Sequence, residues 1–284
     1  MLRWLTAVAA APLLLAAPAA AAGPLARHAP VVVHDSRETD LLTSVATFAG
    51  RVPGVRDGRP RRRPVVYGRR AGPWLQYWML YAHDRQDRGM LSTGRHEGDW
   101  ELVQFRLRGE RLVQAVYAQH SGAESCGYDR VRRTRGGRPI VFAARGSHAA
   151  YFVPGLRDRT WPGPNDEADG RGRRVRPRPV RITAAAPPWM RYAGRWGASR
   201  AGWVPGELDS PRGPGFQARW SNPAAWAAAA RPCARRDCDR RGECDGRETA
   251  AAALLAAIGL LGAGLTGGRR LRRAERPHGR SVAT

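Results

Sequence analysis

Apolar residues in this chain fall in short runs of strand length, separated by turns rich in glycine, proline and arginine. Residues 74–81 (WLQYWMLY) are apolar or aromatic at nearly every position without a helical stripe, which predicts a buried strand. Residues 101–107 and 112–120 alternate in polarity around a turn at 108–111, which predicts a hairpin. Many short strands and few helical patterns predict an all-β fold, a β-sandwich with long loops.

Weaker patterns complete this picture. Four more strands are expected, at 31–33, 65–67, 138–144 and 182–186. Stretches rich in glycine, proline and charged residues predict loops at 52–64 and 161–181, and the polar residues 82–87 predict another. Residues 220–226 predict a short helix, and residues 40–48 fit a helical turn or a strand equally well. The β-sandwich domain is therefore expected to span residues 23–230.

Two apolar segments near the ends predict export and anchoring. Residues 1–22 contain one positive charge, an apolar run and small residues, which predicts a signal peptide cleaved after Ala22 rather than an uncleaved anchor. Residues 249–268 carry no charge, which predicts a transmembrane helix rather than an apolar soluble helix. The Arg-rich tail at 269–284 would then be cytoplasmic. The expected product is a single-pass protein of the cell membrane, with its N-terminal domain outside.

The excess of positive charge comes from a general use of arginine along the chain and does not indicate a dedicated basic surface. The chain has 284 residues and a formal net charge of +24, and all 48 basic residues are arginine. These arginines are scattered, with no basic helical stripe and no aromatic RNA-binding signature, so no nucleic-acid partner is expected. A general attraction to anionic surfaces, such as lipid head groups, is still expected.

Four cysteines suggest disulfides in an exported protein. They are Cys126, Cys233, Cys238 and Cys244, and three of them lie in the stretch 231–248, which we interpret as a Cys-rich stalk. Four cysteines allow three pairings, and the spacing does not choose among them. A zinc site is the alternative, but the spacings do not match the usual zinc patterns.

One polar stretch concentrates the chemistry of the chain. Residues 94–101 (GRHEGDWE) hold a histidine, three carboxylates and a tryptophan. On a strand, Asp99 and Glu101 point to one face and Trp100 to the other. His96 has the wrong parity for the carboxylate face and joins it only if the chain bends, which Gly98 allows. Such a cluster predicts a divalent cation site; solvated turn residues beside a core tryptophan are the simpler alternative.

Two further histidines end expected strands and are the candidates for catalysis. They are His120 and His148, and each is equally well explained as a structural histidine bonded to backbone. Ser147 precedes His148, but neighbours on a strand face opposite ways, so the two are not expected to form a nucleophile–base pair. No nucleophile elbow or zinc-protease motif is present, which disfavours an enzyme.

Several motifs in order carry a family resemblance. These are WLQYWMLY at 74–81, HEGDWE at 96–101, YAQH at 117–120, RPIVFAARGSHAAYF at 138–152, GRWG at 194–197, SPRGPGF at 210–216 and W-x-x-P at 220–223. Together they resemble the vacuolar protein sorting-associated protein 62 family over residues 67–226. The family name reflects a sorting phenotype and implies no particular biochemical activity.

A more distant similarity concerns His96, Asp99, Trp100 and Glu101. This pattern resembles an element of the necrosis- and ethylene-inducing peptide-like cytolysins, whose β-sandwich metal site engages membrane glycans. The resemblance implies an upstream aspartate as a further ligand, and here Asp84 or Asp87 is the candidate. The second histidine of the cytolysin element is missing, which puts cytolytic activity in doubt.

Two functions follow from these observations. In the first, His96, Asp99, Glu101 and Asp84 hold a divalent cation, most simply Ca²⁺ or Mg²⁺, which binds a cell-envelope glycan, a phosphate or a lipid head group. Aromatic and histidine side chains would line the ligand site: Trp100, Tyr81, Tyr117, His120 and His148. In the second, the metal activates water in a secreted hydrolase acting on a phosphoester or a glycoside.

Overall fold

The strand predictions can be compared with a computed structural model that describes residues 23–56, 64–86, 95–157, 165–198, 209–233 and 243–244. Strands dominate these residues and the helices are short, so the prediction of a mainly β protein is confirmed. The expected signal peptide at 1–22, transmembrane helix at 249–268 and tail at 269–284 lie outside the described residues. Within the described residues, no helix is long and apolar enough to cross a membrane.

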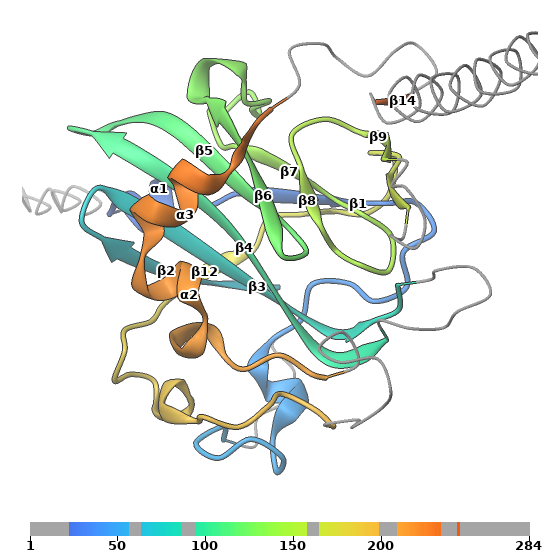
Figure 1. The fold of residues 1–284 in the computed structure, drawn as a ribbon, viewed down its shortest axis with the longest axis vertical. Helices are drawn as coiled ribbons and strands as arrows, with labels where there is room; N and C mark the ends of the chain where they lie inside the picture. The colour runs from blue at the N-terminus through green and yellow to red at the C-terminus, as the bar shows by residue number, and fades with distance from the viewer. Residues whose placement is uncertain are drawn as a thin grey trace, which may run out of the picture.

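The larger sheet has seven strands and forms the centre of the molecule (Figure 1). Its spatial order is β12 (Arg178–Arg181), β2 (Val65–Ala71), β3 (Trp74–Asp84), β4 (His96–Arg108), β5 (Arg111–Gln119), β6 (Gly122–Gly127) and β13 (Arg231–Pro232). Neighbours from β2 to β6 are antiparallel, whereas β12 and β13 pair in parallel at the two edges.

Two smaller sheets complete the strand topology. The four-stranded sheet has the order β11 (Arg174–Val175), β1 (Val31–His34), β7 (Ile140–Ala143) and β8 (Ala150–Tyr151), and β1 and β7 are parallel. The three-stranded sheet has the order β10 (Asp166–Ala168), β9 (Gly155–Arg157) and β14 (Glu243–Cys244).

The large sheet is buried on both faces. One face shares a hydrophobic cluster with the four-stranded sheet, in which Tyr77 and Phe105 join Val32 and Val141. The other face carries Trp78, Trp100 and further aromatic residues. Both faces of β3 are thus buried, which explains why its sequence is continuously apolar instead of alternating.

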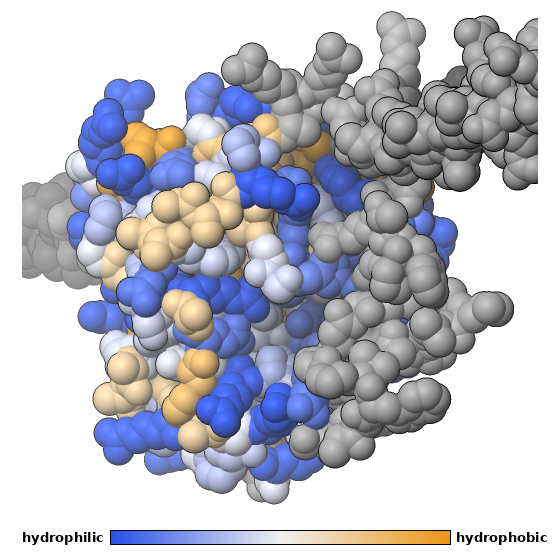
Figure 2. Space-filling view, in the orientation of Figure 1, coloured by the Kyte–Doolittle hydropathy of each residue, from blue (hydrophilic) through white to orange (hydrophobic). Residues whose placement is uncertain are grey.

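Short helical segments cover the second face. They are η1 (Val45–Phe48), η3 (Pro188–Arg191), η4 (Pro214–Phe216), α2 (Ala218–Ser221) and α3 (Pro223–Ala229), with α1 (Pro24–Arg27) and η2 (Tyr128–Arg130) elsewhere. Trp189 of η3 and Trp220 of α2 belong to the second cluster. The surface is largely hydrophilic on the side shown in Figure 2, with weakly apolar colour gathered along the alanine-rich α3.

Three boundaries differ from the expectations. Strand β3 continues to Asp84 and β4 begins at His96, so part of the expected loop at 82–87 is strand. The expected exposed loop at 161–181 contains β10, β11 and β12, whereas the strand expected at 182–186 is absent from the described residues there. Strand β6 gave no clear pattern because it is short and contains two glycines. The helix expected at 220–226 is present as α2 and α3.

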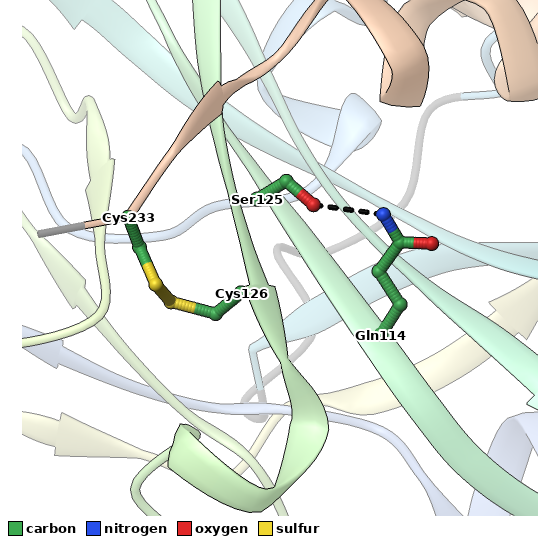
Figure 3. The surroundings of a disulfide bond; sticks show 4 residues. All are labelled: Gln114, Ser125, Cys126 and Cys233. Carbon is green, nitrogen blue, oxygen red and sulfur yellow. Dashed lines mark hydrogen bonds between the residues drawn. A yellow bond between two sulfur atoms is a disulfide. The ribbon is translucent and has the colours of Figure 1, made fainter. Parts of the chain in front are cut away.

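One disulfide ties the end of the domain to the large sheet. Cys126 on β6 is bonded to Cys233, 107 residues later, and both are buried (Figure 3). Beside this bond, the Gln114 side-chain amide donates to the Ser125 hydroxyl at 2.8 Å, which links β5 to β6. Of the possible disulfides among the four cysteines, the described residues thus show Cys126–Cys233. Cys238 and the side chain of Cys244 lie outside the described residues.

We predict that replacing both cysteines, Cys126→Ala with Cys233→Ala, lowers the free energy of unfolding by about 4 kcal/mol. The reason is that a bond closing a loop of this length restricts the unfolded chain by about that amount. Urea unfolding of oxidised wild type and double variant measures the change. Reduced wild type is the control: a much smaller loss on reduction than on substitution would contradict the prediction.

A buried histidine makes the fold sensitive to acid. The His34 Nε2 accepts from the Leu42 backbone N–H at 3.3 Å, so its Nδ1 carries the proton and donates to the Arg173 carbonyl at 3.1 Å. Burial lowers the pKa of His34 from 6.5 to about 4. A second proton would place an N–H against the Leu42 N–H. The folded state therefore requires the neutral ring.

We predict that this ring destabilises the fold as the pH falls from 6.5 towards 4. In this window the histidine of the unfolded chain binds a proton, whereas His34 of the folded protein stays neutral. The free energy of unfolding is therefore highest above pH 6.5 and falls on acidification, by up to about 3 kcal/mol. The measurement is the unfolding free energy of wild type and His34→Gln at pH 7 and pH 4.5. An equal acid-induced loss in both proteins would contradict this assignment.

Candidate functional site

The candidate site lies where β3 ends and β4 begins. Asp84 is paired with His96 across the two strands, and Tyr81 is paired with Asp99. Asp84, His96 and Asp99 each bring one ligand atom into a group whose members all lie within 4.8 Å of one another. The distance from His96 Nε2 to Asp84 Oδ2 is 3.6 Å. The structure therefore gathers three of the four residues that the sequence singled out.

Gly98 makes this grouping possible. Its φ is +66°, a left-handed conformation that interrupts the regular alternation of β4 between His96 and Asp99. The expected bend is therefore present, although it lies inside the strand and not before it. Gly98 also packs directly on Trp196, since a Cβ at this position would lie 2.0 Å from the Trp196 carbonyl oxygen.

Glu101 lies beside the group but does not join it. Its side chain is buried, and Oε2 has no hydrogen-bond partner among the described residues. Burial raises the pKa of Glu101 well above its usual range, and the negative charge of Asp99 adds to the effect. The surroundings of Glu101 therefore favour its neutral form over its charged form.

Asp84 experiences the same two effects. Burial, reinforced by the Asp99 charge, raises the pKa of Asp84 to about 8. Its Oδ1 accepts a hydrogen bond from the Gln86 backbone N–H at 2.7 Å. Carboxylates crowded in a buried site are destabilised unless positive charge joins them, and a divalent cation would provide that charge.

His148 supplies positive charge on the inner side of the group. It lies between β7 and β8, with Nδ1 2.9 Å from Asp99 Oδ2 and Nε2 3.6 Å from Glu38 Oε2. Its ring stacks on Tyr81 at 3.7 Å between centroids. Burial alone would lower the pKa of His148, but the hydrogen bonds to Asp99 and Glu38 outweigh burial and raise it to about 10. His148 is therefore a buried imidazolium.

His120 belongs to a neighbouring polar cluster. Its Nε2 lies 2.8 Å from Asp166 Oδ2, and the other oxygen of Asp166 accepts from the Ser147 hydroxyl at 2.6 Å. Ser147 and His148 bond to different partners, as expected, but they lie in the turn between β7 and β8 and not on a strand. The Gln86 amide nitrogen lies 3.0 Å from His120 Nδ1 and connects this cluster to the candidate site.

Two of the expected ligand-binding aromatics are core residues. Trp100 is buried in the second hydrophobic cluster, against Trp189 and Trp196, on the opposite face from Asp99. Tyr117 is buried between the sheets and donates its hydroxyl to the Ile140 carbonyl at 3.1 Å. Neither side chain lies at the surface. Tyr81 is also buried, but it contacts the site through His148.

A cavity of about 600 Å³ adjoins the site. Gln86 and Glu38, which contact Asp84 and His148 respectively, lie in its wall. Four arginines also line it, namely Arg37, Arg85, Arg95 and Arg145. Sequence reasoning missed this cavity, as well as Glu38 and Asp166, because its lining comes from segments that are distant in the chain. No local motif marks such residues.

These features define a mainly β protein with a buried acidic site at one end of its central strand pair. Residues 86–161 match the family described as vacuolar protein sorting-associated protein 62, so the resemblance predicted from the motifs is confirmed. No curated protein matches the chain.

Solved structures align with this chain at low similarity. A protein described as a toxin fold for microbial attack and plant defense aligns with 58% of this chain and 76% of its own, at 13% identity and a TM-score of 0.36. NLPPya in complex with glucosamine aligns with 55% of this chain and 71% of its own, at 14% identity and a TM-score of 0.34. NLPPya in complex with mannosamine aligns with 58% of this chain and 75% of its own, at 14% identity and a TM-score of 0.35.

We predict that Gly98→Ala destabilises the protein by about 3 kcal/mol or more. An alanine must adopt a left-handed conformation there and also displace the Trp196 backbone. Gly109→Ala is the matched control, because Gly109 has a similar φ of +59° but open space around its Cβ position. Its expected loss is about 1 kcal/mol. Chemical denaturation measures both, and equal losses would show that the contact with Trp196 is unimportant.

Proposed function

We propose that the protein is a cation-dependent binding protein for a phosphate-bearing ligand of the cell envelope, carried on a β-sandwich domain outside the cell. The observation that supports it most is the convergence of Asp84, His96 and Asp99 within 4.8 Å. The Cys126–Cys233 disulfide fits an oxidising compartment, as expected for an exported domain. Anchoring through residues 249–268 is part of the same proposal.

The donor set suits a hard or borderline divalent cation. Two carboxylates favour Ca²⁺ or Mg²⁺, and one imidazole makes Mn²⁺ a further candidate. Two buried oxygen atoms around the group lack hydrogen-bond partners among the described residues, namely Glu101 Oε2 and Tyr81 OH. Such atoms are expected where an ion and its bound water complete a polar site.

The arginines beside the site favour an anionic ligand. Arg145 and Arg95 are exposed, and no described carboxylate pairs with either side chain. Guanidinium groups bind phosphate through paired hydrogen bonds, while the cation coordinates a phosphate oxygen in place of water. The hydrolase alternative receives less support, because His148 lies between the Asp99 and Glu38 carboxylates, which raise its pKa and make it a poor acceptor for a proton from water.

We predict that millimolar Ca²⁺, Mg²⁺ or Mn²⁺ raises the melting temperature of wild type by about 5 °C or more, because a cation bound only to the folded state stabilises it. Asp84→Asn retains an acceptor for the Gln86 N–H but removes one anionic ligand, so its gain should be at most half as large. Asp40→Asn is the control, since Asp40 pairs with His83 outside the group. No shift for wild type with any of the three ions would refute the cation role.

The ligand class can be tested separately. With the effective cation present, glucose 6-phosphate should bind measurably by calorimetry and glucose should not. Arg145→Gln should weaken binding several-fold without changing the thermal shift caused by the cation alone. If glucose binds as tightly as its phosphate, the ligand is a neutral glycan and the anionic assignment is wrong.

A further inference from the structure

A second cavity lies at the other end of the large sheet. It is a groove of about 570 Å³ whose apolar wall includes Leu25 of α1, Leu75 of β3, Ile182 and Trp220. Leu75 and Asp84 stand nine positions apart on β3, which places the groove about 30 Å along the strand from the candidate cation site. The groove is therefore independent of the function proposed above.

The charged residues that line this groove are all positive among the described residues. Arg69 and Arg70 at the end of β2 and Arg181 at the end of β12 all line it, and no carboxylate does among the described residues. Arg70 and Arg181 are exposed, and neither forms an ion pair with a described residue. The Arg70 guanidinium donates a hydrogen bond to the nearby Gly72 carbonyl at 3.2 Å. An anion in the groove would meet two unpaired cations.

Arg69 adds a guanidinium that is held in place. It lies over the Trp220 ring at 3.6 Å and donates to Gln76 Oε1 at 2.7 Å and to the Trp220 carbonyl. Burial lowers the pKa of Arg69 to about 10, and no carboxylate opposes this effect. The positive charge of Arg69 is thus partly desolvated and balanced only by neutral dipoles, which makes an external anion favourable.

We propose that this groove binds a single-chain amphiphile with an anionic head group, of the medium-chain fatty acid type. Its head would lie against Arg70 and Arg181, and its alkyl chain would cover Leu25, Leu75 and Ile182. The volume falls in the range of small-molecule sites, and the combination of an apolar wall with a few charged groups is typical of them. A free inorganic anion would leave the apolar wall exposed, and a neutral lipid would leave the arginines unpaired.

Photolabelling of the full chain tests this assignment. A decanoate carrying a diazirine at its chain end should label peptides containing residues 23–26, 69–75, 179–184 or 220, and unlabelled decanoate should compete. The matched diazirine decanol, which has the same tail without the charge, should label these peptides at least fivefold less. Inorganic phosphate at the same concentration should not compete.

Two variants separate charge from shape. Arg70→Gln with Arg181→Gln should reduce labelling at least fivefold, whereas Arg108→Gln with Arg111→Gln, an exposed pair that does not line the groove, should not. Ala184→Trp places bulk in the groove from an exposed position and should abolish labelling. Equal labelling by the alcohol, no effect of the groove arginines, labelling elsewhere, or no labelling would each overturn the proposal.

Discussion

The antiparallel pairing of β3 with β4 is the constraint on which the rest of the structure depends. It runs without a break in register from Trp74 opposite Arg106 to Asp84 opposite His96. Both faces of these strands are buried. A slip of one residue would therefore exchange the faces of Trp100 and Asp99 and move Trp100 out of the aromatic cluster in which it packs. Aromatic packing therefore fixes the position of the acidic residues, although the aromatic side chains lie in the hydrophobic clusters and not in the candidate site.

The acidic end of this strand pair is unfavourable by itself. Asp84, Asp99 and Glu101 lie close together with little access to water, and His148 offers one positive charge to Asp99 while sharing it with Glu38. Stability and binding are opposed here, because the charges that would hold a cation raise the energy of the cation-free fold. Packing of Gly98 against Trp196 keeps the carboxylates together despite this cost.

The sequence predicted local features well and long-range contacts poorly. The continuous apolar run of β3, the hairpin of β4 and β5 and the parity of Asp99, Trp100 and Glu101 follow from neighbouring residues, and all are present. The partners of His148 and His120 come from Glu38 and Asp166, which only tertiary folding brings near. The strands at 166–181 were missed because edge pairing, rather than apolar content, creates them.

Both edges of the seven-stranded sheet end in a proline-containing strand. Pro179 lies on β12 opposite Val66, and Pro232 lies on β13 opposite Ser125. Proline has no N–H to offer to an incoming strand, and the neighbouring arginines repel one another when two such edges meet. We therefore expect that a second molecule cannot extend the sheet edge to edge, so a chain this rich in β-structure is protected against self-association through these edges.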